Sequence, residues 1–137
     1  MIVVDTNVVA YYWIPGPRTG AAEALAEIDP QWVAPALWRY ELRNVLATLV
    51  RTGKVTLDVA LGVAAGAEDQ VGDATGEADA KAVLSLASQS GCSAYDCEFV
   101  GVALALGAPF VTCDRKLAKA FPGVATSLEE FVARAGR

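Results

Sequence analysis

Four acidic residues lie at the end of an apolar run, near the start of a predicted helix, or beside the apolar face of one. A carboxylate that is buried without a partner in such a setting is energetically costly. These residues are Asp5, Glu41, Asp96 and Asp114. Hard cations such as Mg²⁺ and Mn²⁺ prefer carboxylate oxygens as ligands. Two such ions about 4 Å apart can activate a water and stabilise the leaving oxygen of a phosphodiester. The four acids therefore predict a divalent-metal site with hydrolytic chemistry.

Each acid also has a simpler explanation when it is taken alone. Asp5, Asp96 and Asp114 stand at or near predicted helix N-termini, where a carboxylate caps backbone N–H groups or favours the helix dipole. Glu41 could pair with an arginine, because buried charges need partners. These explanations require four separate coincidences, whereas one oxygen-lined metal pocket accounts for all four acids together.

The chain has 137 residues and contains no histidine. That absence excludes Ser-His-Asp triads, Cys-His dyads and HExxH sites, so a general base must be a carboxylate, a lysine or a metal-bound water. The net charge of −5 argues by itself against nucleic acid, whose binders usually carry a basic footprint. Two bound divalent cations would offset most of that charge, and the charge balance therefore does not decide the partner.

The three cysteines, Cys92, Cys97 and Cys113, are an odd number with spacings that fit no zinc pattern. We interpret them as small buried apolar residues in a reducing cytosol. The longest apolar stretch, 99–111, is interrupted by glycine and proline and is too short to cross a bilayer. The N-terminus lacks the basic segment of a signal peptide, so we expect a cytoplasmic protein with no membrane contact.

Short apolar segments alternate with helix-like segments along the chain, as in parallel sheets covered by helices on both faces. Asp5-Thr6-Asn7 is also suited to capping a following helix. Strands are expected at 2–4, 31–34, 70–74 and 109–112, with a fifth near 124. Helices are expected at 19–28, 36–52, 56–66, 76–89, 94–106 and 114–120, and from 127 onward.

Binding sites in such sheets lie beyond the carboxyl ends of the strands. Asp5 and Asp114 each follow an expected strand, so we expect their side chains to share one crevice. The chain shows no linker, repeat or low-complexity segment, and we therefore expect one domain over residues 1–137.

Four motifs occur in order: Asp5-Thr6-Asn7, Glu41-x-x-Asn44, Ser93-Ala94-Tyr95-Asp96 and Thr112-x-Asp114. Each motif alone is weakly specific, but the ordered set spans nearly the whole chain and closely resembles the PIN-domain ribonucleases. The segment 35–44 is especially similar to the VapC-type toxins of toxin–antitoxin pairs.

The resemblance implies an α/β fold, a PIN-like three-layer α/β/α sandwich with a central parallel sheet of four to five strands. It implies Mg²⁺- or Mn²⁺-dependent cleavage of RNA by activated water, homodimerisation, and an antitoxin that blocks the active site. The implied catalytic and metal-binding residues are Asp5, Glu41, Asp96 and Asp114. The residues implied to orient carboxylates and waters are Thr6, Asn44, Ser93 and Thr112.

Two cysteines lie beside these motifs. Cys97 stands where the family pattern often has alanine, and we interpret it as a packing residue. Cys113 should point away from Thr112 and Asp114, because side chains alternate along a strand.

Other functions fit less of the pattern. A PIN nuclease of RNA maturation or turnover shares the same motifs and is the nearest alternative. A receiver-like signalling module would need paired acids after the first strand, whereas Thr6 follows Asp5, and it would leave Glu41 without a role. An inactive interaction domain would not need all four acids.

Several basic and aromatic residues near the motifs are suited to contacts with RNA, or in the case of the aromatic run with an antitoxin helix. A solvated face is the favoured explanation for the basic residues, and core or dimer packing for the aromatic run. The basic residues are Arg18, Arg39, Arg43, Arg115, Lys116 and Lys119, and the aromatic run is Tyr11-Tyr12-Trp13.

Overall fold

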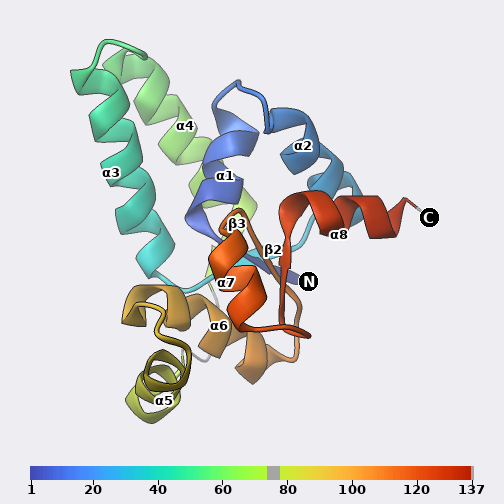
Figure 1. Cartoon of the computed structure of the whole chain (residues 1–137). Coiled ribbons are helices and arrows are strands. Elements are labelled where there is room, and N and C mark those ends of the chain that lie inside the picture. The colour runs from blue at the N-terminus through green and yellow to red at the C-terminus, as the bar shows by residue number, and fades with distance from the viewer. Residues whose placement is uncertain (74–77, 137) are drawn as a thin grey trace.

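A parallel sheet of short strands lies at the centre of the molecule in the computed structural model, which describes residues 1–73 and 78–136 (Figure 1). Within these residues the sheet has five strands in the order β3-β2-β1-β4-β5, with β1 in the middle. The strands are β1 Ile2–Val4, β2 Trp32–Ala34, β3 Val71–Asp73, β4 Phe110–Thr112 and β5 Ala125–Ser127.

Helices cover both faces of this sheet (Figure 1). Many of them begin where the sequence offers a capping oxygen, as at Thr56, Asp79 and Ser127, whose side chains accept backbone N–H bonds. The described helices are α1 Thr6–Trp13, α2 Thr19–Ile28, α3 Leu37–Arg51, α4 Leu57–Gln70, α5 Ala80–Ser90, α6 Ala94–Leu106, α7 Arg115–Ala120 and α8 Leu128–Ala135.

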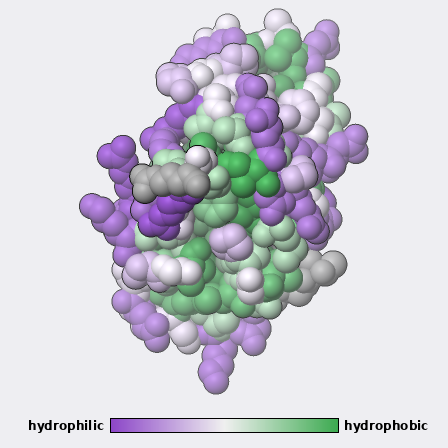
Figure 2. Space-filling view, turned by 90° about the vertical axis from the view of Figure 1, so that its right-hand side faces the viewer, coloured by the Kyte–Doolittle hydropathy of each residue, from purple (hydrophilic) through white to green (hydrophobic). Residues whose placement is uncertain are grey.

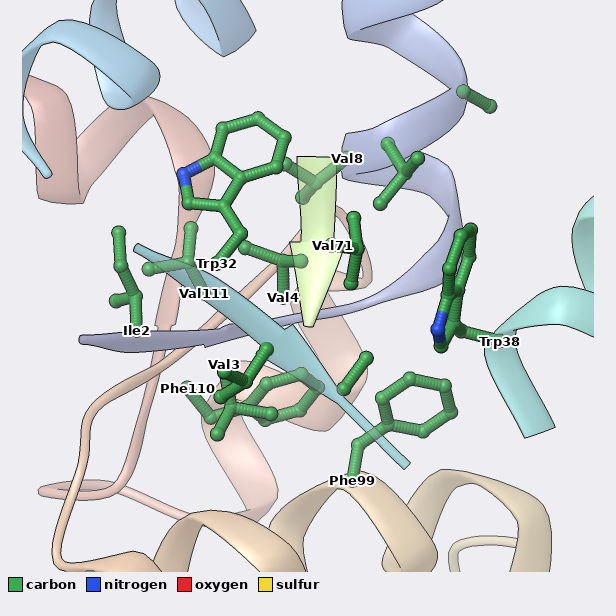
Figure 3. Packing of buried hydrophobic residues seen from close by; sticks show 14 of the residues in the cluster. Ile2, Val3, Val4, Val8, Trp32, Trp38, Val71, Phe99, Phe110 and Val111 are labelled. Carbon is green, nitrogen blue, oxygen red and sulfur yellow. The ribbon is translucent and has the colours of Figure 1, made fainter. Parts of the chain in front are cut away.

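The two faces of the central strands are both buried in apolar side chains. Val3 and Phe110 point toward α6, whereas Val4 and Trp32 point to the opposite face, toward α1 (Figure 3). Burying a side chain of this size contributes about 1.5–3 kcal/mol. The expected three-layer α/β/α arrangement with a parallel sheet of four to five strands is thus confirmed.

One helix differs from its expected bounds. The prediction that α4 ends at Gly66 is wrong, because the helix continues to Gln70. Gly66 lies where α4 packs against α1, and a Cβ there would stand 2.5 Å from the Trp13 ring. Trp13 Nε1 also donates a hydrogen bond of 2.7 Å to Gln70 Oε1. The glycine therefore permits close helix packing instead of ending the helix.

A second difference concerns α5. The expected start at residue 76 falls on residues 74–77, which lie outside the described residues. The helix begins at Ala80, after Asp79 caps it. The strand expected at 70–74 is observed as β3, Val71–Asp73. Residue 74 of the expected range also lies outside the described residues.

Smaller features agree only in part with the sequence analysis. The aromatic run 11–13 packs against the core, with the Tyr12 and Trp32 rings 5.5 Å apart. All three cysteines are free thiols. Cys97 is buried as expected, but the prediction that Cys92 and Cys113 are buried is wrong, because both are half-buried. The surface beside α2 and α8 mixes hydrophilic and apolar residues (Figure 2). None of the described helices is long and apolar enough to cross a membrane.

Candidate active site

An open cleft of about 480 Å³ lies at the carboxyl ends of β1 and β4, between the first turns of α3, α6 and α7. Apolar side chains form part of its lining, including Phe99, Phe110 and Leu117. The structure brings all four candidate acids to this cleft. Its polar lining residues are Asp5, Thr6, Asn7, Glu41, Asn44, Asp96 and Asp114.

Asp5 is the most firmly held of the acids. The parallel register pairs Val4 with Val111, which sets Asp5 beside the end of β4. Its Oδ1 accepts the Val8 N–H at 3.0 Å, and its Oδ2 accepts both the Thr112 hydroxyl and the Cys113 N–H, the latter at 3.0 Å. Three donors from two chain segments therefore fix this carboxylate.

Thr112 connects Asp5 with Asp114. It is completely buried, and its hydroxyl donates to Asp5 while accepting the Asp114 N–H at 3.0 Å. Asp114 Oδ1 accepts the Leu117 N–H at 3.1 Å and so caps α7. Asp5 and Asp114 thus act as helix caps and line the cleft at the same time, so the simpler explanation and the functional one are compatible.

Glu41 reaches the cleft from α3, and its partner is a hydroxyl. The buried Thr6 side chain donates to Glu41 Oε1 at 2.8 Å. The neighbouring arginines pair elsewhere, Arg39 with Asp73 and Arg43 with Glu68. Among the described residues no arginine pairs with Glu41, so the alternative explanation of an ion pair is not supported.

Asp96 reaches the cleft from the first turn of α6. Ser93 caps this helix, and its Oγ accepts the Asp96 N–H at 3.1 Å. Ser93 therefore holds the backbone of Asp96. Within residues 1–73 and 78–136, the Asp96 carboxylate itself has neither a hydrogen bond nor an ion pair.

Burial and mutual repulsion both act on the carboxylates. Burial is the largest effect on Asp5 and raises its pKa. The three hydrogen bonds to this carboxylate lower the pKa in part, and the charge of Asp114 raises it further. Burial also raises the pKa of Glu41, partly opposed by the Thr6 hydrogen bond and reinforced by the charges of Asp96 and Asp5. The acids are thus close enough to disfavour one another's charge.

A hard divalent cation fits this donor chemistry. The cleft offers carboxylates, two amides and hydroxyls, with no histidine and no cysteine among its lining residues. In the described part of the chain, no three Asp, Glu, Cys or His side chains converge closely enough to hold one ion. Because Mg²⁺ usually keeps several waters and takes only one or two carboxylates, the oxygen-only set still suits it.

The sequence analysis missed part of the cleft. Asn7, Leu37 and Tyr40 line it but were not singled out for it. Tyr40 and Tyr95 directly precede Glu41 and Asp96, and that adjacency is a signal that the sequence itself contained. Cys113 does not line the cleft, and burial with the nearby Asp5 charge raises its pKa to about 12.

Comparison with known proteins bears on the family and the fold. A family model described as "PIN domain" matches residues 2–121. The crystal structure of PAE2754 from Pyrobaculum aerophilum is similar, with a TM-score of 0.77 and 23% sequence identity, over 98% of this chain and 96% of that one. That structure supports the fold. No curated protein matches the sequence significantly.

Proposed function

This chain belongs to the PIN-domain family, whose members are generally nucleases, and on that premise we propose that it is an Mg²⁺- or Mn²⁺-dependent endoribonuclease. The observation that carries the proposal is the convergence of Asp5, Glu41, Asp96 and Asp114 on one cleft from four separate elements. A cluster of like charges gathered in one cleft is unfavourable unless cations compensate it. The reaction we propose is hydrolysis of an RNA phosphodiester bond.

The roles of the chain's own residues follow from their contacts. Asp5, Glu41, Asp96 and Asp114 would share the binding of one or two cations, each held by only one or two of the carboxylates. A bound cation supplies Lewis-acid stabilisation for attack of water on the phosphodiester. Thr112 and the Cys113 N–H keep Asp5 in one orientation, and Thr6 does the same for Glu41. Such outer partners strengthen a metal site by restricting its ligands. Asn44 lies in the same cleft and is suited to orient a water.

The finer role that we propose is that of a toxin. The segment 35–44 resembles VapC-type toxins, and this supports a cytoplasmic homodimer whose cleft is blocked by a cognate antitoxin. A small gene for such an antitoxin beside this one would favour the toxin over a PIN nuclease of RNA maturation. Copurification of the two proteins with loss of cleavage would test the pairing directly.

The decisive experiment is cleavage of a mixed RNA pool by the purified protein with Mg²⁺, with Mn²⁺ and with EDTA. Asp5→Ala should abolish cleavage, because it removes the most firmly positioned carboxylate. Asp58→Ala is the matched control, since Asp58 is exposed on α4 and does not line the cleft. Equal cleavage by wild type and Asp5→Ala would reveal a contaminant and overturn the assignment.

A further inference from the structure

Arg18 joins separate parts of the molecule without lining the acidic cleft. It directly precedes α2. Its Nε lies 3.2 Å from Glu129 Oε1 on α8, and its Cζ lies 5.4 Å from the centroid of the Tyr11 ring on α1. One side chain therefore contacts two helices from opposite ends of the sequence.

The turn that carries Arg18 is itself held by hydrogen bonds. The Thr19 hydroxyl donates to the Tyr11 carbonyl at 2.7 Å and accepts the Gly16 N–H at 3.0 Å. The Arg18 carbonyl accepts the Ala22 N–H at 3.1 Å at the start of α2. These bonds fix the backbone from which the arginine side chain extends, and less conformational entropy is then lost when its guanidinium makes contacts.

The same side chain reaches Cys113, which stands between Arg18 and Asp5. Burial raises the pKa of the Cys113 thiol, and the charge of Asp5 acts in the same direction. The charge of Arg18 and a hydrogen bond between the two side chains lower that pKa in part. Cys113 thus meets Arg18 through its thiol, while its backbone N–H donates to Asp5 Oδ2 at 3.0 Å.

Glu129 connects this contact to the C-terminal helix. α8 packs beside α2 and follows β5, which pairs with β4 (Figure 1). Glu129 lies in the first turn of α8, whereas its neighbour Glu130 pairs with Arg134 inside the same helix. Among the described residues, Arg18–Glu129 is therefore the ion pair that joins α8 to another element.

Two simpler roles for Arg18 account for less of this geometry. A contact with RNA in the cleft does not fit an arginine that pairs with Glu129 and lies outside the cleft lining. A partly exposed ion pair, taken alone, contributes little to stability and has no effect on a carboxylate elsewhere. Arg18 differs from such a pair because its other partner, Cys113, supplies one of the three donors that hold Asp5.

We propose that Arg18 is a positioning residue for the metal site: its contact with Cys113 holds that residue so that the Cys113 N–H stays directed at Asp5. The inference rests on the proposed metal-dependent function and extends it to a side chain outside the cleft. Partners that orient a metal ligand directly change metal affinity by about 10- to 100-fold, and Arg18 acts one residue further away, so we expect about three- to tenfold from its loss.

The test measures Mn²⁺ binding by electron paramagnetic resonance, which requires neither RNA nor cleavage. Arg18→Gln should raise the Kd for Mn²⁺ about three- to tenfold. Arg18→Lys keeps the charge and should bind Mn²⁺ with a Kd between those of wild type and Arg18→Gln. Arg134→Gln is the matched control, since it removes an arginine that pairs only within α8, and it should bind as wild type does. All of these variants should unfold in EDTA at nearly the wild-type temperature.

A double-mutant cycle tests the path through Cys113. Cys113→Ala removes the thiol and keeps the N–H, so it should weaken Mn²⁺ binding by itself. Arg18→Gln should then add little to that loss, because both changes break the same contact. Glu129→Gln breaks only the ion pair and should weaken binding less than Arg18→Gln does, whereas Glu130→Gln should leave it unchanged.

Each contrary outcome has a distinct meaning. If wild type binds Mn²⁺ and Arg18→Gln binds it equally well, the inference is overturned and the proposed nuclease stands. Losses from Arg18→Gln and Cys113→Ala that add in full would overturn the path through Cys113. A lower melting temperature in EDTA with an unchanged Kd would make Arg18 a structural link between α2 and α8. Absence of Mn²⁺ binding by wild type would overturn the proposed metal-dependent function, and the inference with it.

Discussion

The two walls of the acidic cleft hold their carboxylates in different ways. The strand wall, Asp5 and Asp114, lies at the ends of β1 and β4, where four hydrogen bonds from backbone and side chain fix the two carboxylates. The helix wall, Glu41 and Asp96, projects from α3 and α6. There one hydroxyl contacts Glu41, and the described residues give the Asp96 carboxylate no partner.

This difference follows from the elements that carry each wall. Adjacent parallel strands end at one sheet edge, where free N–H groups and a buried threonine can surround a carboxylate. A helix satisfies its own N–H groups after the first turn, and in the first turn of α6 the Asp96 N–H already bonds Ser93 Oγ. The two helix-wall acids therefore depend on side chains from elsewhere. The strand wall is thus organised by the fold, whereas the helix wall retains freedom that a bound cation would restrict.

Metal binding should give the largest effect and reveal this asymmetry. At about one hundred times its Kd, Mg²⁺ or Mn²⁺ should raise the free energy of unfolding by about 2.7 kcal/mol, because it binds only the folded cleft. Hydrogen exchange should slow most in the first turns of α3 and α6 and least beside β1 and β4. The measurement is thermal unfolding with hydrogen-exchange mass spectrometry, in EDTA and with added metal.

The control for metal binding is Asp58→Asn, which removes an exposed acid of α4 and should keep the full shift. Asp96→Asn should lose most of it. If added metal slowed hydrogen exchange more at the strand wall than at the helix wall, the strand wall would be the less ordered of the two in the metal-free protein.

A matched pair of threonine substitutions should give an intermediate effect. Thr112→Val removes the hydroxyl that bonds both Asp5 and the Asp114 N–H, whereas Thr6→Val removes only the bond to Glu41. Leaving buried polar groups unsatisfied costs about 1–3 kcal/mol, so Thr112→Val should cost about 2 kcal/mol and Thr6→Val about 1 kcal/mol. Urea denaturation in EDTA measures both, and equal losses would show that the strand wall is no more dependent on its hydroxyl than the helix wall.

The pH dependence of the metal-free protein should give the smallest effect. Because burial and the charges of Asp96 and Asp5 raise the pKa of Glu41, the folded state binds its proton more tightly than the unfolded state does. Protonated Glu41 therefore stabilises the folded state fully below its unfolded pKa of about 4.3. This stabilisation is lost as the pH rises through the higher pKa of Glu41 in the folded state. Thermal melts in EDTA between pH 4 and pH 8 would record this loss, and Glu41→Gln should reduce it to the part that the raised pKa of Asp5 contributes.

Asp96→Asn tests the repulsion itself. It should abolish cleavage, lower the pKa of Glu41, and leave the metal-free protein as stable as wild type or more stable by less than about 1 kcal/mol. Carboxyl carbon NMR titration measures the pKa of Glu41, and thermal melts measure the stability of the metal-free protein. A large loss of stability would identify Asp96 as a structural residue and not a member of a repulsive cluster.

The sequence predicted the strand wall well because its signals are local. An apolar run followed by a capping acid predicts both a strand end and a helix start, as at Asp5 and Asp114. Strand 2–4 and helices 19–28 and 94–106 also have the expected bounds, the last of them with Ser93 as its cap. Such patterns need only a few neighbouring residues, and a single sequence contains them.

The features that sequence reasoning missed depend on distant contacts. Gly66 looks like a helix end until the ring of Trp13 lies against it. The hydrogen bond from Thr6 to Glu41 joins residues 35 apart, and no local pattern selects that partner over an arginine. Tyr40 resembles an ordinary surface aromatic until α3 and α6 bring it opposite Tyr95. Tertiary packing decides each of these.

The position of β1 in the sheet also has a consequence for biosynthesis. Asp5 is made before its partners Thr112 and Cys113, which follow 107 and 108 residues later. Contacts of such separation must wait for the intervening chain to be synthesised and for the loop to close. A growing chain on the ribosome therefore carries Asp5 without its strand-wall partners until β4 has emerged, and the acidic cleft cannot assemble before that point.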